Sequence, residues 1–169
     1  KPVILYQYGK TRSKSNIQKF LTGFSGTLVS DAFSGYKSLD KNDENIHSAF
    51  CWAHARRDYA DALKALKGED KNYAHETVAH KALVQIAAIY KAEEALKNLT
   101  AEERYSRRQR EVKPLVEAYF TWVKSVDPDS VISENTRNGL KYSLNQEKYL
   151  KMFEHPVKFM LYNGKLITI

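Results

Sequence analysis

Apolar residues follow two different patterns along the chain. In the first third they lie in short runs bounded by turn-forming residues, at 2–8, 27–29 and 46–51, which is typical of buried strands. After Gly68 they recur every three or four positions, which indicates amphipathic helices. The pattern therefore predicts a helix-rich α/β protein.

The first part of the chain, 1–67, is predicted to alternate strands and helices. Ser13 or Ser15 is placed to cap a helix at 17–24, which separates the strand at 2–8 from a strand that ends at Asp31. A strand, helix, strand order requires a parallel, right-handed crossover, which brings both strand ends to one edge of the sheet.

A third strand, at 46–51, is predicted to lead into a helix at 53–67. At 100° per residue the apolar side chains of this helix share one face, and the polar ones lie opposite. Arg56 is at the boundary, so it either lies along the core or points into a site beside the sheet. The apolar face holds Trp52, Ala55, Tyr59, Leu63 and Leu66, and the polar face holds His54, Arg57, Asp61 and Lys64.

The second part, 68–155, is predicted to be helical throughout, with helices at 75–98, 100–126 and 134–154. Pro114 predicts a kink in the second of these helices. Thr100 and Glu103 have the spacing of a capping box and start it.

Two further features of the helical part and the tail leave alternatives open. Four arginines in the 100–126 helix either bind phosphates or pair with neighbouring glutamates on a solvated surface, and the second interpretation is favoured. The tail, 156–169, contains Asn163-Gly164 and is predicted to be a hairpin or one strand of the main sheet. The four arginines are Arg104, Arg107, Arg108 and Arg110.

Composition narrows the class of protein. Of the 169 residues 43% are hydrophobic and 28% are charged, which is typical of a soluble globular protein. No stretch is apolar enough to span a membrane, and the N-terminal segment is too short and polar for a signal peptide. Cys51 is the single cysteine, as expected for a cytoplasmic protein. A net charge of +7 suggests a polyanionic partner, although many basic proteins bind no nucleic acid.

Asp31 is the main candidate for a residue of a ligand-binding or catalytic site. A carboxylate at the C-terminal end of a buried strand is held rigidly, and ligand sites of open α/β sheets are built there. The same position also suits a turn or helix-cap residue. Arg12 follows the first strand and is expected either near Asp31 or in a solvated loop. Cys51 and His54 form a C-x-x-H pair, but two ligands do not make a structural zinc site.

Three segments of the chain carry a family resemblance. GFSGTLVSDAFSGYKSL, FCWAHARRDYADALKAL and SLNQEKYL resemble the transposases of bacterial insertion sequences of the IS66 type, over about residues 3–153. The resemblance implies a ribonuclease-H-like (integrase-like) α/β core, incomplete in this chain, with a large all-α insertion. The core part is then 1–67 and the insertion 68–155, and the segment 156–169 returns to the core.

The resemblance also implies an activity. Transposases of this type cut and join double-stranded DNA, at insertion-sequence ends and target, through an Asp, Asp, Glu triad that holds two Mg²⁺ or Mn²⁺ ions. Asp31 matches the second Asp, and is expected to be catalytic and a metal ligand. His54, Arg56 and Arg57, together with Arg12, are candidates for contact with DNA or the catalytic pocket. Self-association and a cytoplasmic, nucleoid-associated location are expected.

The sequence departs from the family pattern in one respect that matters. The first Asp and the Glu of the triad have no counterpart here, so the chain is interpreted as the central part of a transposase. By itself it is expected to bind the ions weakly or not at all and to be inactive. A non-catalytic DNA-binding or assembly module, and a purely structural helical remnant, are the alternatives.

Overall fold

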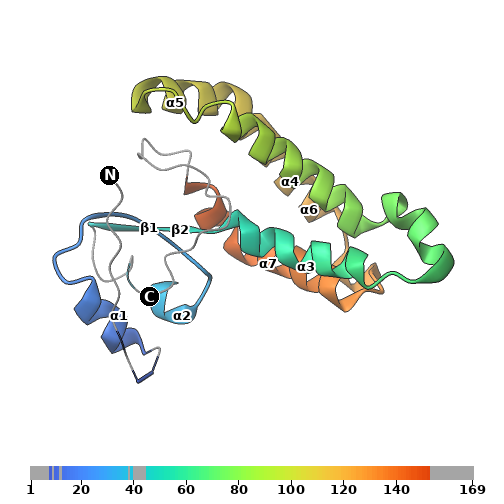
Figure 1. Ribbon diagram of the computed structural model, residues 1–169, viewed down its shortest axis with the longest axis horizontal. Coiled ribbons are helices and arrows are strands. Elements are labelled where there is room, and N and C mark those ends of the chain that lie inside the picture. Colours follow the sequence, from blue (N-terminus) through green and yellow to red (C-terminus); the bar gives the residue numbers. More distant parts are fainter. Residues whose placement is uncertain (1–7, 9, 12, 38, 40–44, 153–169) are drawn as a thin grey trace.

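The protein is helix-rich and has a small parallel sheet at one end (Figure 1). The computed structural model describes residues 8, 10–11, 13–37, 39 and 45–152. Residues 2–7 of the predicted first strand, Arg12 and the tail at 156–169 therefore lie outside the described residues. Tyr8, the last residue of that predicted strand, is described and is exposed and not in a strand.

The sheet described by the structure consists of two parallel strands, β1 (Gly26–Ser30) and β2 (Ile46–Phe50). Their register pairs Gly26 with Ile46 and Ser30 with Phe50, so the two strands end level with each other. Both strands were predicted from the sequence and are confirmed within one residue at each end. Parallel pairing places the residues that follow both strands at the same edge of the sheet.

Two short helices pack on one face of the sheet. Helix α1 (Lys14–Phe20) is capped by Ser13, whose hydroxyl accepts a hydrogen bond from the Asn16 backbone, as one of the two predicted caps. Helix α2 (Ser34–Lys37) follows β1. A small core joins these helices to the strands because their apolar residues converge there: Ile17, Leu28, Tyr36, Leu39 and Ile46.

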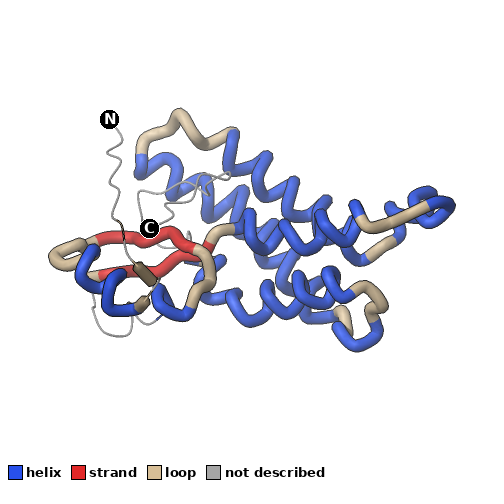
Figure 2. Tube along the Cα trace, turned by 60° about the horizontal axis from the view of Figure 1, so that its bottom comes forward, coloured by secondary structure: helices blue, strands red, loops and turns tan. Residues whose placement is uncertain are grey.

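The helical part packs on the other end of the sheet (Figure 2). Helix α3 (Trp52–Lys64) leaves β2 directly and lies beside α7 (Glu134–Leu150), as Figure 1 also shows. Helices α4 (Val78–Glu94) and α6 (Lys113–Ser125) pack against this pair and against each other. The remaining elements are η1 (Gly68–Glu76), α5 (Ala101–Arg107), η2 (Arg108–Val112) and η3 (Pro128–Ser130).

One continuous core runs from the end of β2 through the four long helices. Trp52 is buried at the start of α3, and its indole Nε1 donates a hydrogen bond to the backbone oxygen of Leu150 at 3.0 Å. The ring of Phe50 stacks on Tyr149, with 4.3 Å between the centroids. These contacts fix the C-terminal end of α7 against the point where the strand becomes a helix.

Helices α3 and α7 approach closely at Gly139. A Cβ atom at this position would lie 2.8 Å from the ring of Tyr59, so the glycine makes room for that ring. The hydroxyl groups of Tyr119 and Ser143 lie 2.7 Å apart beside it, and Ser143 donates to the Gly139 oxygen at 2.8 Å. Burial raises the pKa of both tyrosines, Tyr59 and Tyr119.

The predicted helix boundaries need several corrections. Helix α1 begins three residues earlier than predicted and ends at Phe20, and α4 ends at Glu94. The segment before Thr77 is a 3₁₀ turn, and α4 begins only where the Thr77 hydroxyl caps it. The helix predicted at 100–126 is interrupted by the π turn η2, and Pro114 lies in the first turn of α6, where no hydrogen bond is lost. Helix α7 ends at Leu150, and the Trp52 indole donates a hydrogen bond to the backbone oxygen of that residue. The Thr100 and Glu103 capping box is confirmed.

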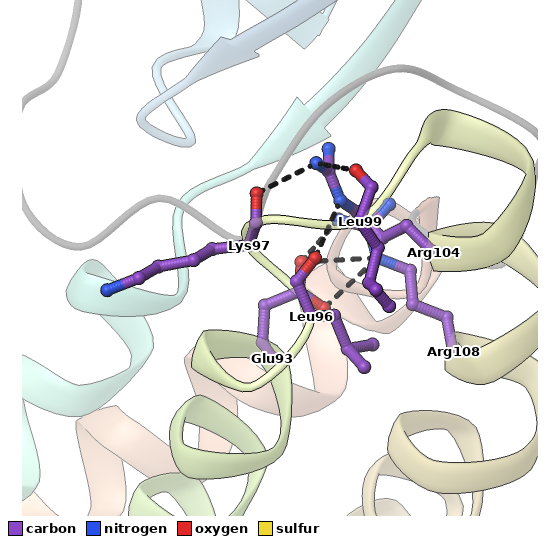
Figure 3. Close-up of polar contacts among 6 residues, drawn as sticks. All are labelled: Glu93, Leu96, Lys97, Leu99, Arg104 and Arg108. Carbon is purple, nitrogen blue, oxygen red and sulfur yellow. Dashed lines mark hydrogen bonds and ion pairs between the residues drawn. The ribbon is translucent and has the colours of Figure 1, made fainter.

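The arginines of α5 and η2 pair within the protein (Figure 3). Arg104 donates hydrogen bonds to the backbone oxygens of Leu96, Lys97 and Leu99, and these bonds hold the turn that follows α4. Arg107 forms a two-point pair with Glu111 at 2.6 and 2.8 Å. The favoured interpretation, pairing with a neighbouring glutamate at the surface, is thus confirmed for Arg107, whereas Arg104 binds backbone oxygens instead.

Arg108 differs from its neighbours because it is buried. Its side chain is 1% exposed and pairs with Glu93, which is 4% exposed, and its Nε lies 3.0 and 3.1 Å from the two carboxylate oxygens. The prediction of a solvated surface is wrong for this residue, because its side chain is buried against Glu93 of α4. A buried pair of this kind ties α4 to η2.

We expect replacement of Arg108 by methionine to lower the free energy of unfolding by about 3–5 kcal/mol, since it removes the cation opposite a buried carboxylate. Urea unfolding measures the change. The matched control is Arg107→Met, which breaks an exposed pair and should shift the unfolding midpoint little. Equal midpoints for the two variants would contradict a stabilising role for the buried cation.

Candidate active site at the ends of the parallel strands

Asp31 lies directly after β1, at the edge where both strands end. The backbone of Cys51, directly after β2, donates to the Ser30 oxygen at 3.1 Å, so the pairing of the strands continues up to the aspartate. The Asp31 side chain is half-buried, and Oδ1 accepts a hydrogen bond from the Phe33 backbone at 3.2 Å. The turn role predicted as the alternative for Asp31 is therefore present. It occupies part of the carboxylate, which has lone pairs for further partners.

Helix α3 follows directly after β2, the strand beside β1, and carries the basic residues that are candidates for DNA contact. Cys51 is its N-cap and makes no side-chain capping bond. His54 is half-buried in the first turn, whereas Arg56 and Arg57 are exposed. The helix therefore begins beside Asp31 and presents two cations to solvent within its first two turns. Its buried face is that of the predicted wheel, with Trp52 and Tyr59 inside.

Tyr142 of α7 lies within the electrostatic range of Asp31. Burial raises the pKa of the Tyr142 hydroxyl well above its ordinary value; the charges of Cys51, Asp31 and Asp58 raise it further, and Arg57 lowers it. Asp31 and Arg57, which are far apart in sequence, thus act on the same hydroxyl group.

Arg56 acts on a different tyrosine. Burial raises the pKa of Tyr90, on α4, with a further rise from Cys51 and a decrease from Arg56. Arg56 and Arg57 therefore influence the α4 and α7 sides of α3, respectively. His54 belongs to the Arg57 side, since both lower the pKa of Asp58.

Sequence reasoning missed the two tyrosines. Tyr90 was assigned to an apolar helical stripe, and Tyr142 was not singled out, because a tyrosine in an amphipathic helix is usually a core residue. No local signal distinguishes them. Only the packing of α4 and α7 on α3 allows Cys51, after the end of β2, to affect the pKa of both tyrosines.

The described residues do not by themselves fit a divalent-metal site. Among them, no group of three or more His, Cys, Asp or Glu side chains is placed to hold an ion. Mg²⁺ needs about six oxygen ligands, and Asp31 supplies at most two.

Among the described residues, no helix combines the length and apolar character needed to cross a bilayer.

The comparisons with known proteins identify the class to which this arrangement belongs. The family model described as "Transposase IS66 family" matches residues 1–160. The chain therefore belongs to the IS66 transposase family, as the segments around Asp31 and His54 predicted. No solved structure matches the chain.

Curated relatives occur in Sinorhizobium fredii. The uncharacterized protein y4jD is 28% identical over 85% of this chain and 27% of its own length. The uncharacterized proteins y4qI and y4hP are 26% and 30% identical over 90% and 72% of this chain, and over 28% and 23% of their own lengths. The chain thus spans about a quarter of these relatives.

Asp58 gives a test of the electrostatics along the polar face of α3. Burial and the nearby Asp61 raise its pKa above the ordinary value of 3.8, while Arg57 and His54 oppose the rise. A raised folded-state pKa means that ionised Asp58 destabilises the fold at neutral pH. We expect Asp58→Asn to raise the melting temperature at pH 7.

The gain should disappear as the pH falls below 3.8, because Asp58 is then protonated in both the folded and the unfolded state. Thermal unfolding at a series of pH values measures it. The control is Asp70→Asn, at an exposed position in η1. A melting temperature that falls at pH 7 in Asp58→Asn would show that the ionised carboxylate stabilises the fold instead.

Proposed function

We propose that the chain carries part of the active site of a DDE-type transposase that cuts and joins DNA at the ends of an insertion sequence. The observation that carries this proposal is the position of Asp31 at the C-terminal end of a strand, within the range matched by the transposase family model. A second parallel strand and a helix with two exposed arginines lie directly beside it.

The proposed fold is a ribonuclease-H-like core with a helical insertion. The parallel pair β1 and β2, followed by α3, supports the assignment of 1–67 to the core. The segment 68–155 is the proposed insertion. Its packing on β2 and α3 through one shared core supports a role in forming the site rather than a separate domain.

In this proposal Asp31 supplies one ligand for the Mg²⁺ or Mn²⁺ ions of the site. A carboxylate on a rigid strand end is the ligand type that hard divalent ions prefer. The described residues contain no three-residue ligand group, so the other ligands of the proposed site come from outside them. By itself, this part of the protein is expected to be inactive.

The proposed substrate is double-stranded DNA. Arg56 and Arg57 project into solvent at the start of α3, and the chain as a whole has a net charge of +7. Exposed guanidinium groups bind phosphate oxygens without reading base sequence, and such contacts hold and orient the backbone. His54 lies on the same turn and is a further candidate for this contact.

Asp31→Asn tests the catalytic part of the proposal. An asparagine Oδ1 accepts the Phe33 backbone hydrogen bond as well as the aspartate does, so the turn is kept while the charge is lost. In the full-length protein we expect DNA cleavage at the insertion-sequence ends to fall at least about 100-fold, since a ligand of the ions is removed. A gel assay of end cleavage measures it.

Melting temperature and DNA affinity should stay unchanged in Asp31→Asn, and the control Asp129→Asn, at an exposed position in η3, should retain activity. Retained cleavage in Asp31→Asn would refute the catalytic assignment. DNA binding without cleavage by the unmutated full-length protein would favour the non-catalytic module.

Arg57→Ala tests the DNA contact. If Arg57 neutralises one phosphate, the variant should bind DNA more weakly, and the slope of log affinity against log salt should decrease by about one unit. Fluorescence anisotropy with labelled duplex measures both quantities. Lys67→Ala removes the same charge beyond the end of α3 and is the control. Identical salt slopes for both variants would show that Arg57 is no specific phosphate contact.

A further inference from the structure

Acidic residues are absent from the beginning of the chain. Asp31 is the first of the 20 aspartates and glutamates in the sequence. Protein surfaces usually mix charges of both signs, so a segment that carries cations alone requires explanation. The cations that precede Asp31 are Lys1, Lys10, Arg12, Lys14 and Lys19.

Three of these lysines belong to the described residues, and all three are exposed: Lys10, Lys14 and Lys19. None of them forms an ion pair with a carboxylate of the residues that the structure describes. Their charge is therefore not neutralised within that part of the protein. By contrast, several lysines farther along the chain are paired with an aspartate or a glutamate: Lys64, Lys97, Lys124 and Lys151.

Helix α1 presents these charges on an outer surface. Its buried residue is Ile17, which is 3% exposed and packs into the small core between the helix and the sheet. The Asn16 amide donates a hydrogen bond to the Thr11 oxygen at 2.9 Å, which holds the segment of Lys10 against the first turn of the helix. The exposed side chains carry ammonium, hydroxyl and amide groups and no carboxylate. They are Lys10, Lys14, Ser15, Gln18 and Lys19, and we call them the α1 surface.

The same helix supports the turn that holds Asp31. Oδ1 of Asp31 accepts a hydrogen bond from the Phe33 backbone at 3.2 Å. A Cβ atom at Gly35 would lie 2.7 Å from the Phe33 ring and 2.9 Å from the Ile17 side chain, so α1 packs directly on this turn. Figure 1 shows α1 beside α2 at the sheet end of the molecule. The α1 surface therefore belongs to a helix that adjoins the candidate site.

The composition of the α1 surface indicates the chemistry of its partner. Ammonium groups pair with phosphate oxygens as point charges, and hydroxyl and amide groups donate hydrogen bonds to the same oxygens. Lys14 and Lys19 are five residues apart, which is about 7.5 Å along a helix, so they suit separate groups of a polyanion better than one small anion. A partner that carries a row of phosphates fits this surface.

We propose that the α1 surface binds the phosphate backbone of the DNA that reaches Asp31. This inference rests on the proposed function and extends it, because it adds α1 to the arginines of α3 as a DNA contact. Both helices adjoin the end of β1, α1 through the contact of Ile17 with Gly35 and α3 through the hydrogen bond from the Cys51 backbone to Ser30. Such contacts hold and orient a duplex without reading its sequence.

The test is the double variant Lys14→Ala with Lys19→Ala in the full-length protein. Loss of two phosphate contacts should decrease the slope of log affinity against log salt by about two units. The affinity should fall by the same factor for a duplex with the insertion-sequence end and for an unrelated duplex, because phosphate contacts carry no sequence information. Fluorescence anisotropy with the two labelled duplexes measures both quantities.

The matched control is Lys67→Ala with Lys71→Ala, which removes the same charge at η1. Both of these lysines are exposed, and Figure 1 shows η1, in green, at the end of the molecule opposite the sheet. This control should bind DNA with an unchanged salt slope. Lys14→Arg with Lys19→Arg keeps the charge of the α1 surface and should also retain the slope.

Two further measurements separate a DNA contact from a structural role. The melting temperature of the free alanine variant should stay unchanged, because both side chains are exposed and form no ion pair with a described residue. End cleavage by this variant should fall at low DNA concentration and recover at saturating DNA, because the variant loses binding that the bound substrate and the transition state share.

Equal salt slopes for the alanine variant and its control would overturn the inference, as would a weakening confined to the insertion-sequence end or a clear fall in melting temperature. Asp31→Asn separates this failure from that of the proposed function. If Asp31→Asn is inactive and the alanine variant keeps its slope, only the α1 surface is misassigned. If Asp31→Asn retains cleavage and the slope of the alanine variant decreases, the α1 surface is confirmed and the catalytic assignment is wrong. Absence of DNA binding by the unmutated protein would overturn both.

Discussion

The packing of α7 on the junction between β2 and α3 is the constraint on which the rest of the structure depends. Trp52 is the first residue of α3, and its indole donates a hydrogen bond to the backbone oxygen of Leu150. Phe50, at the end of β2, stacks on Tyr149. The large aromatic surfaces supply the burial, and the single indole hydrogen bond satisfies a carbonyl at the end of α7. A strand end and a helix end that lie about a hundred residues apart are thereby joined.

This junction determines what surrounds Asp31. The two-stranded parallel sheet alone would leave the aspartate at an open edge, with the solvent-exposed start of α3 beside it. Helix α7, which carries Tyr142, packs against β2 and α3, and Asp31 and Arg57 both affect the pKa of Tyr142. A charge placed next to a partly buried group acts more strongly than the same charge in bulk water.

Much of the local structure was predictable because it depends on neighbours in sequence. Ser13 caps α1 and Thr100 starts α5 through hydrogen bonds that span three residues. The apolar face of α3 followed the expected wheel, and β1 ended at the predicted aspartate. The burial of Arg108 was not predictable, because its partner Glu93 lies fifteen positions earlier, on another helix.

The sequence by itself determined the class of protein and the position of its main candidate residue. A carboxylate after a short apolar strand, a CWAHARR segment and their spacing are local features, and the family match agrees with them. Which side chains approach that carboxylate was decided only by the tertiary structure. Tyr142 looks like any core tyrosine of an amphipathic helix until α7 lies antiparallel to α3, because the groups that raise its pKa come from segments with no fixed spacing in sequence.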